Sequence, residues 1–361
     1  MKLLERTPVS RPLRVLATLA GFAVIALAVG LTVAPGGASR RPHSETIAST
    51  KHASTQQGGM AGMNMSGPPA PPKLPANSPC TPRVCPIPKP GPDELAVAGQ
   101  LGSATAAAWV TRNGGQVQAR VEVLNLNLGP VREPVRFDDA TTQRSCGPGC
   151  WLLTLPTDAA KLTLSAVRHG HRYAVSLPLS WQPGRAARAR ALVARAVQTM
   201  SGLVGLRLEE RLATGTPGSP GALLDIHFRL RAPNAMSATA TGHRDRQVTI
   251  GSTQWNYTPG VGWTSGGYYD GNGHTVFNTA SLFTWHQDEQ SAQVLSDEMR
   301  GDRRVAVIAL MNPQVPAWLQ MTVETRTALV RHVKIVSQGK FTDDRFSDYG
   351  VPQRVVPPTI P

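Results

Sequence analysis

Short segments in which apolar and polar residues alternate dominate the chain from residue 97 onward. In QVQARVEV, Val117, Ala119, Val121 and Val123 alternate with polar side chains, which is the period of a half-buried β-strand. Turn residues separate six such segments: 106–111, 116–129, 131–137, 150–155, 161–168 and 173–181. They predict a small antiparallel, immunoglobulin-like β-sandwich as a domain of residues 97–183.

One segment follows a helical period instead. Over residues 185–204, apolar side chains recur at spacings of four, three, four and three residues, at Ala189, Val193, Ala196, Met200 and Leu203. This stripe predicts an amphipathic helix whose apolar side lies on a core.

After the helix, strand-like alternation returns and continues almost to the end of the chain. Ile226, Phe228 and Leu230 alternate with polar residues, and so do Leu319, Met321 and Val323. We expect a long, one-sided antiparallel meander, curved into a half-barrel and covered by the helix, as a domain of residues 184–361. The predicted fold class is therefore mainly β (α+β).

The N-terminal pattern indicates export. Residues 15–34 carry no charge and are long enough to cross a bilayer, and the residues before them are basic. Residues 1–34 are thus expected to be a cytoplasmic tip and a transmembrane segment of a single-pass cell-membrane protein. The alternative is a secreted protein, because the small residues Gly36, Gly37 and Ala38 fit a signal cleavage site.

A linker is predicted for residues 35–96. Thirteen prolines lie between Pro35 and Pro92, with almost no large apolar residue to build a core. The formal net charge is +14, of which +6 lies in residues 1–100 and +4 in residues 185–211. For an exported chain, attraction to an anionic lipid surface or a cell-wall polymer is a better use of this charge than a nucleic-acid partner. An ordinary solvated basic surface is favoured over both. The oligomeric state is left open.

Four cysteines form two close pairs, Cys80/Cys85 in CTPRVC and Cys146/Cys150 in CGPGC. In an oxidising compartment disulfides are the default. Local pairing is the simplest of the three connectivities, and the other two stay open.

A soft-metal site is the main chemical candidate. Met60, Met63 and Met65 lie within six residues, with His52 and His43 upstream, and such thioethers suit copper(I). No cofactor is certain. The sequence has no catalytic motif, and Asp343 and Asp344, being adjacent, are expected on opposite faces of a strand. We therefore do not expect an enzyme.

The C-terminal half resembles the LolA/LprG-type lipoprotein-carrier superfamily. The similar segments are VTIGSTQWNYTPGVGW, AWLQMTVETRTALVRHVKI and FTDDRFSDYGVPQRVVPP. The resemblance implies an N-terminal helix that plugs a half-open, curved β-sheet. Together with the preceding sandwich, the region also resembles the extracytoplasmic tails of CopD-type copper-transport proteins, although their multi-span membrane part has no counterpart here.

These observations predict a binding protein that holds a lipid, an acyl chain or another apolar ligand, or a lipid-modified partner. The expected cavity wall comprises Val193, Met200, Ile226, Phe228, Leu230, Leu319, Met321 and Val323, with Val248 and Ile250 on the same wall. Trp255, Trp263, Trp285 and Trp318 either line this cavity or belong to the core. Two alternatives are extracytoplasmic copper handling through the Met/His linker and a structural envelope-interaction module.

Overall fold

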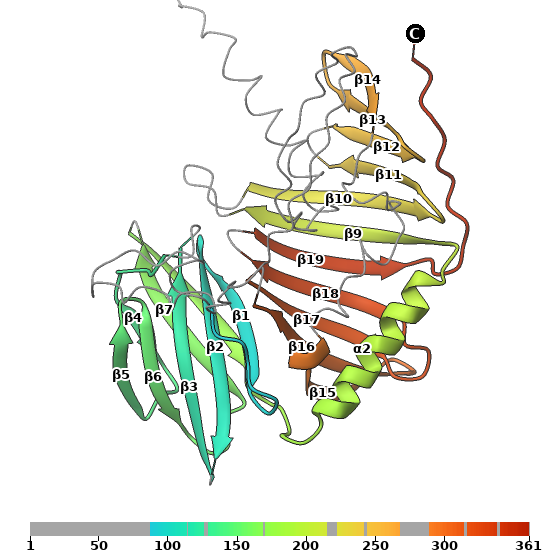
Figure 1. Cartoon of the computed structure of the whole chain (residues 1–361). Coiled ribbons are helices and arrows are strands. Elements are labelled where there is room, and N and C mark those ends of the chain that lie inside the picture. Colours follow the sequence, from blue (N-terminus) through green and yellow to red (C-terminus); the bar gives the residue numbers. More distant parts are fainter. Residues whose placement is uncertain are drawn as a thin grey trace, which may run out of the picture. The chain divides into compact units, whose positions relative to one another are not determined.

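The computed structural model shows the described residues to be almost entirely β-structure. It describes residues 87–113, 115–125, 129–168, 170–214, 222–241, 244–267, 289–313, 316–337 and 340–360. Its described elements are two small sheets, one large sheet, one α-helix and one short 3-10 helix, η2 (Glu289–Ser291). The prediction of a mainly β chain with one helix is confirmed (Figure 1).

The first region consists of two antiparallel sheets. One has the order β1-β2-β3-β6-β5 and the other β4-β7-β8. The strands are β1 (Leu95–Leu101), β2 (Ala104–Asn113), β3 (Gln116–Leu124), β4 (Val135–Phe137), β5 (Thr142–Gly147), β6 (Cys150–Leu155), β7 (Lys161–Arg168) and β8 (His171–Pro178). Sequence alternation missed two of them. In β1 the small residues Ala96, Ala98 and Gly99 lie among the larger apolar ones, and β5 has no large apolar residue, so neither shows a clear alternation of apolar and polar positions.

Helix α2 (Ala186–Ser201) lies within the predicted helical segment. Its buried residues include four of the five predicted stripe positions, Ala189, Val193, Ala196 and Met200. Leu203 follows the helix and packs half-buried against the same cluster. The helical period therefore identified both the helix and the side that it buries.

The large sheet has eleven antiparallel strands in the order β14-β13-β12-β11-β10-β9-β19-β18-β17-β16-β15 (Figure 1). They are β9 (Gly205–Thr214), β10 (Ala222–Arg231), β11 (Ala235–Ala240), β12 (Arg246–Ile250), β13 (Thr253–Thr258), β14 (Gly262–Gly267), β15 (Gln293–Arg300), β16 (Arg303–Asn312), β17 (Ala317–Glu324), β18 (Val330–Ser337) and β19 (Lys340–Ser347).

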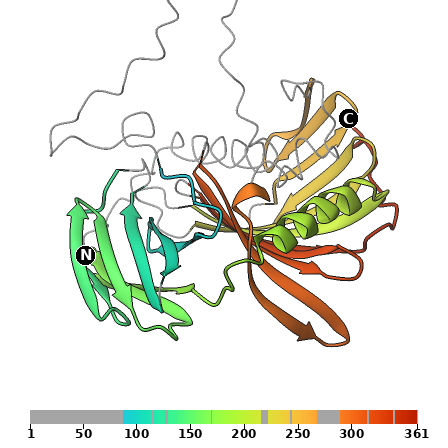
Figure 2. The ribbon, with the colours of Figure 1, turned by 60° about the horizontal axis from the view of Figure 1, so that its bottom comes forward.

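This order corrects the expectation of one long meander. In a single meander β14 would pair with β15, whereas these two strands end the sheet on opposite sides. The last strand, β19, pairs instead with the first, β9, so two meanders join in the middle of the sheet. The sheet is strongly curved, and α2 lies against the face that we call the inner face (Figure 2).

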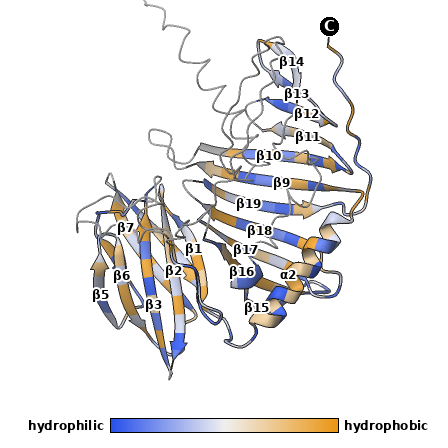
Figure 3. Ribbon diagram, viewed as in Figure 1, coloured by the Kyte–Doolittle hydropathy of each residue, from blue (hydrophilic) through white to orange (hydrophobic). Residues whose placement is uncertain are grey.

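The opposite, outer face is not uniformly solvent-exposed, which corrects the one-sided expectation for part of the sheet. Val307 and Ala309 of β16 share a buried cluster with residues of the sandwich strands. Trp318 of β17 packs edge to face against Trp109 of β2, with ring centroids 5.9 Å apart. Strand β16 is therefore buried on both faces, which explains its nearly continuous apolar run. Apolar and polar residues alternate more clearly in β9 and β10 (Figure 3).

The predicted transmembrane or signal segment and the proline-rich linker up to residue 86 lie outside the described residues. Among the residues that are described, no helix is long and apolar enough to cross a membrane.

Candidate ligand-binding site

The residues predicted to form a cavity wall lie together on the inner face. All eight are buried and belong to one hydrophobic cluster that joins α2 to both meanders: Val193, Met200, Ile226, Phe228, Leu230, Leu319, Met321 and Val323. Whether this cluster opens for a ligand stays a prediction.

A single row of side chains crosses the inner face from strand to strand. Direct cross-strand partners run through Ala240, Ile226, Glu210, Asp344, Val333, Met321, Ile308 and Val294. Every apolar member of this row belongs to the cluster that also contains α2. Neighbouring partners on one face of a sheet are about 5 Å apart, so these side chains form a continuous strip. In the middle of the strip stand two carboxyl groups.

Glu210 and Asp344 are the central pair of that row. Residue exposure is 5% for Glu210 and 8% for Asp344. Glu210 shares its face of β9 with Leu208 and Leu212, and Asp344 shares its face of β19 with Phe346. Glu210 Oε1 and Asp344 Oδ1 are both buried and have no hydrogen-bond partner among the described residues.

Burial governs the electrostatics of this pair. It raises the pKa of Glu210, although the charge of Lys340 acts in the opposite direction. It raises the pKa of Asp344 well above its usual range, and the neighbouring Glu210 raises it further. Lys340, half-buried on the same face of β19, has its pKa lowered by burial, while the two carboxyls act to raise it. Because two carboxylates side by side repel each other, the pair favours holding a proton.

Sequence reasoning missed this pair, although a signal was present. In LRLEERL, Glu210 occupies the position at which the alternation of Leu206, Leu208 and Leu212 calls for an apolar residue. The predicted separation of the adjacent aspartates is confirmed, since Asp343 lies on the outer face near His332, with 2.9 Å between Asp343 Oδ1 and His332 Nε2. What alternation alone could not reveal is that Asp344 lies beside Glu210, because the β9–β19 pairing joins residues more than 120 positions apart.

Several predicted wall residues belong to the other face. Val248 pairs with Trp255 across β12 and β13, and both pack with Val355 of the C-terminal tail. Ile250 and Trp263 join that outer cluster. The prediction for Val248 and Ile250 is therefore wrong. In β12 the polar residues Gln247 and Thr249 lie on the inner face, and Val248 and Ile250 lie on the outer face.

The tryptophans fit the core interpretation and not the cavity. Trp255 and Trp263 lie beneath the tail, and Trp318 packs against Trp109. Trp285 lies outside the described residues. The inner wall is thus aliphatic in the main, with Phe228 and Phe346 as its buried aromatic residues in the described part of the sheet.

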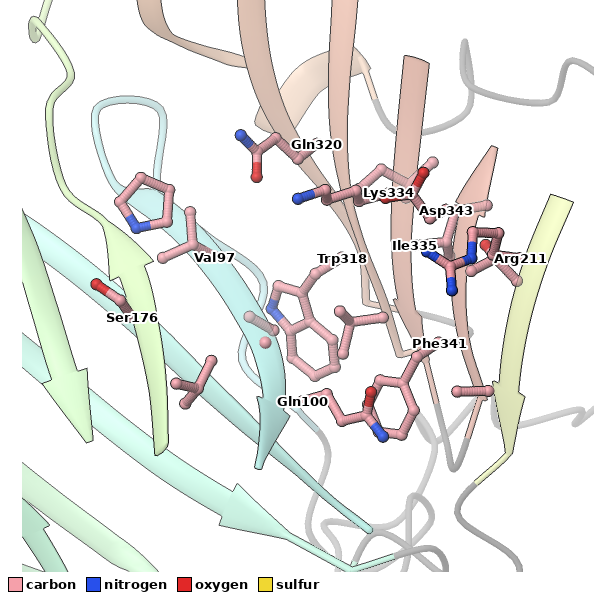
Figure 4. Close-up of a pocket in the computed structure, with 18 residues that line it drawn as sticks. Val97, Gln100, Ser176, Arg211, Trp318, Gln320, Lys334, Ile335, Phe341 and Asp343 are labelled. Atoms are coloured by element: carbon pink, nitrogen blue, oxygen red, sulfur yellow. The ribbon is translucent and has the colours of Figure 1, made fainter. Parts of the chain in front are cut away.

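A pocket of about 450 Å³ lies on the outer face, where β1 and β8 approach β9, β17, β18 and β19. Trp318 and Phe341 supply apolar surface, and Arg211, Lys334 and Asp343 supply charge (Figure 4). Two of these charges are already matched by the protein, because Arg211 pairs with Asp225 at 3.1 Å and Asp343 with His332 and Arg345. This pocket therefore gives a weaker indication of a specific ligand than the unpaired carboxyls of the inner face.

The predicted disulfide between Cys146 and Cys150 is confirmed, with 5.1 Å between the Cα atoms. Cys80 and Cys85 lie outside the described residues, as does the predicted copper set of His43, His52, Met60, Met63 and Met65. Copper binding stays a prediction. Within the part of the chain that the structure describes, no group of three or more His, Cys, Asp or Glu side chains is placed to hold a metal ion.

Comparisons with known proteins give likenesses only at the level of structure. No family model and no curated protein matches the chain. Among solved structures, it is similar to the lipoprotein LppX of Mycobacterium tuberculosis, with 11% identity, a TM-score of 0.36, and coverage of 47% of this chain and 99% of LppX. For LprF of Mycobacterium bovis the values are 10% identity, a TM-score of 0.35, and coverage of 50% and 99%.

A LolA superfamily protein from Nitrosomonas europaea is similar at 12% identity and a TM-score of 0.23, covering 47% of this chain and 94% of that one. The resemblance seen in the sequence predicted a helix set against a curved antiparallel sheet in the C-terminal half. The structure of this chain has that LolA/LprG-like arrangement, with α2 against the inner face of β9–β19. The resemblance of the whole region to CopD-type tails stays a prediction.

Proposed function

We propose that this protein is an extracytoplasmic binding protein that takes the apolar chain of a lipid or a lipid-modified molecule against the inner face of its large sheet. The observation that carries the proposal is the continuous apolar wall, which extends across eight strands and onto one helix. Burying an acyl chain there contributes about 0.8 kcal/mol per methylene group.

The helix is suited to such a role because it presents small side chains to the sheet. Ala189 and Ala196 are fully buried on the side of the helix that also buries Leu192, Val193 and Met200. At these two points the side chain of the helix occupies less of the space above the sheet than a larger residue would. Movement of one helix would then admit a guest without disturbing the strand pairing.

The compartment is supported by the disulfide. Cys146 and Cys150 are joined across a tight loop, and such bonds persist in oxidising environments such as those outside the cytoplasm.

The test is binding of an apolar fluorescent dye, N-phenyl-1-naphthylamine, to the purified protein, combined with native mass spectrometry of protein taken from membranes. We expect saturable dye binding and co-purified lipid. Val193→Trp should abolish both, because it fills the space between α2 and the sheet at a fully buried position. Ala194→Trp is the matched control, since the next residue is exposed on the opposite side of the helix and should bind like the wild type.

If the wild-type protein carries no lipid and binds no dye, the large sheet is a solid-core interaction module. If both tryptophan variants bind like the wild type, the ligand lies somewhere other than under α2.

A further inference from the structure

The inner face carries a polar site at its centre, built from two neighbouring strands. Glu210 of β9 and Asp344 of β19 are direct cross-strand partners, and both meander halves contribute apolar residues on either side of them, Ile226 on one and Val333 on the other. Figure 1 shows β9 and β19 in the middle of the sheet. Any chain lying along the apolar row therefore passes the two carboxyls.

A third group on the same face points to the same place. Thr342 lies two residues from Asp344 on β19, so both side chains share the inner face. Its exposure is 6%, and its Oγ1 has no hydrogen-bond partner among the described residues. Three buried side chains thus leave one oxygen each unsatisfied within one small area, whereas buried polar atoms in proteins are nearly always hydrogen-bonded.

The charge of the cluster limits what it can recognise. Burial and mutual repulsion favour one shared proton on the two carboxyls. With Lys340 cationic on the same face, the cluster then carries no net charge. A cationic ligand would lie beside the charge of Lys340, and an anionic ligand would face the remaining carboxylate. An uncharged group that both donates and accepts hydrogen bonds matches all three side chains.

We propose that Glu210, Asp344 and Thr342 bind the uncharged, hydroxyl-bearing polar group of an otherwise apolar ligand. The inference rests on the proposed function and specifies its ligand class: an acyl chain that carries free hydroxyl groups, such as a partial glyceride. A ligand hydroxyl donates to the carboxylate and accepts from the protonated carboxyl or from Thr342. The apolar chain extends along the row on either side.

The experiment compares four ligands that share one acyl chain: monooleoylglycerol, methyl oleate, oleylamine and oleate. Each displaces N-phenyl-1-naphthylamine from the full chain at neutral pH. We expect monooleoylglycerol to bind at least tenfold more tightly than methyl oleate, since hydrogen bonds to charged or partly charged groups of a dry site are strong. Oleylamine and oleate should not exceed monooleoylglycerol.

Two variants remove the site without removing the trough. Glu210→Leu with Asp344→Leu should lower the affinity for monooleoylglycerol about tenfold and leave that for methyl oleate unchanged. Glu209→Leu is the matched control, because Glu209 is exposed on the outer face of the same strand and should retain the preference. Thr342→Val is an independent test with a smaller substitution. We expect it to reduce the preference for monooleoylglycerol over methyl oleate twofold to fivefold.

Equal affinity of the wild-type protein for all four ligands overturns this inference and leaves the proposed function standing. Tightest binding of oleylamine, lost in the double variant, also overturns it, because the pair would then recognise a cation. An unchanged preference in both the double variant and Thr342→Val overturns it as well. If neither the dye nor any of the four ligands binds, the proposed function fails and this inference fails with it.

Discussion

Two glutamates of the large sheet have the same solvent exposure, 5%, but Glu210 lies deep inside the sheet and Glu324 lies near the surface. Glu324, at the end of β17, accepts hydrogen bonds from Arg331 at 2.6 and 2.9 Å and from Thr327, and lies 3.3 Å from Arg303. Glu210, in the middle of β9, has an unpartnered Oε1 and an apolar neighbour, Ile226, on one side. The same side chain at the same solvent exposure is therefore held in place by the protein in one region and left incomplete in the other.

The pKa directions express this difference. Burial acts to raise the pKa of Glu324, but the hydrogen bonds from Thr327 and Arg331 outweigh it and the pKa falls. Burial raises the pKa of Glu210 without a comparable partner. A buried acid that is fully satisfied has a structural explanation within the fold. An unsatisfied one lowers stability, and the proposed binding of a ligand hydroxyl group would give Glu210 its missing partner.

The largest effect is expected from Glu324→Leu. It leaves the partly buried Arg331 and its neighbour Arg303 without their carboxylate, which should destabilise the protein by about 3 kcal/mol. The free energy of unfolding in urea, measured without ligand, tests this. A loss below about 0.5 kcal/mol would show that water replaces the glutamate as the partner of the two arginines. Glu324 could then no longer be contrasted with Glu210 as an acid that stabilises the fold.

The same substitution at Glu210 should have the opposite sign. Glu210→Leu removes an unsatisfied polar atom from an apolar row, and we expect a gain of about 2 kcal/mol in the same urea measurement. A destabilisation similar to that of Glu324→Leu would mean that Glu210 supports the fold, and the contrast between the two glutamates would no longer hold.

The pH dependence of stability should separate the two regions again. The folded-state pKa values of Glu210 and Asp344 are raised. The contribution of the two carboxyl groups to the free energy of unfolding is therefore fully present below the unfolded pKa of about 4 and is lost as the pH rises through the folded-state values. Stability of the Glu210→Leu, Asp344→Leu double variant relative to the wild type should therefore increase with pH, by up to about 1.4 kcal/mol per pH unit and proton.

For Glu324, whose folded-state pKa is lowered, the contribution is present above about pH 4.3 and is lost as the pH falls. The cost of Glu324→Leu should accordingly shrink in acid. Urea unfolding between pH 2 and 8 measures both differences, and parallel pH profiles for the two sites would contradict the assignment of opposite pKa shifts.

The smallest effect is expected on the outer face. Asp343→Asn removes the charge that faces His332 and Arg345 in partly exposed pairs, and it should cost about 0.5 kcal/mol. Asp344→Asn, one residue further, should leave stability unchanged or raise it. Thermal unfolding of the two single variants measures this difference. Equal changes in the unfolding temperature would show that the carboxyl groups on the two faces of β19 contribute equally to stability.

Local periodicity predicted much of this fold because α2 and most strands bury one side only. Ala189, Val193 and Met200 mark the helix, and Ile226, Phe228 and Leu230 mark the inner face of β10. Periodicity failed for strands that are buried on both faces or that pack through small residues, as β1 does. It also failed where a polar residue lies on the inner face, as Thr249 does in β12.

The candidate site shows the same division. The apolar wall could be assembled from individual strands, since each carries its own alternation. The carboxyl pair could not, because it depends on which strands become neighbours. Nothing in the segments that contain Glu210 and Asp344 specifies that β9 pairs with β19 and not with another strand. Long-range pairing is set by the packing of the whole sheet, and local sequence does not encode it.

The central position of β19 also constrains when the sheet can form. The strand that joins the two meanders follows all the other described strands of the sheet along the chain, so β9 and β18 have no shared neighbour until residue 347 has been synthesised. Contacts of such sequence separation form slowly, and the two halves stay apart during translation. The two meanders of the large sheet therefore stay unjoined until β19 has been synthesised, so the sheet cannot form progressively as each strand is made.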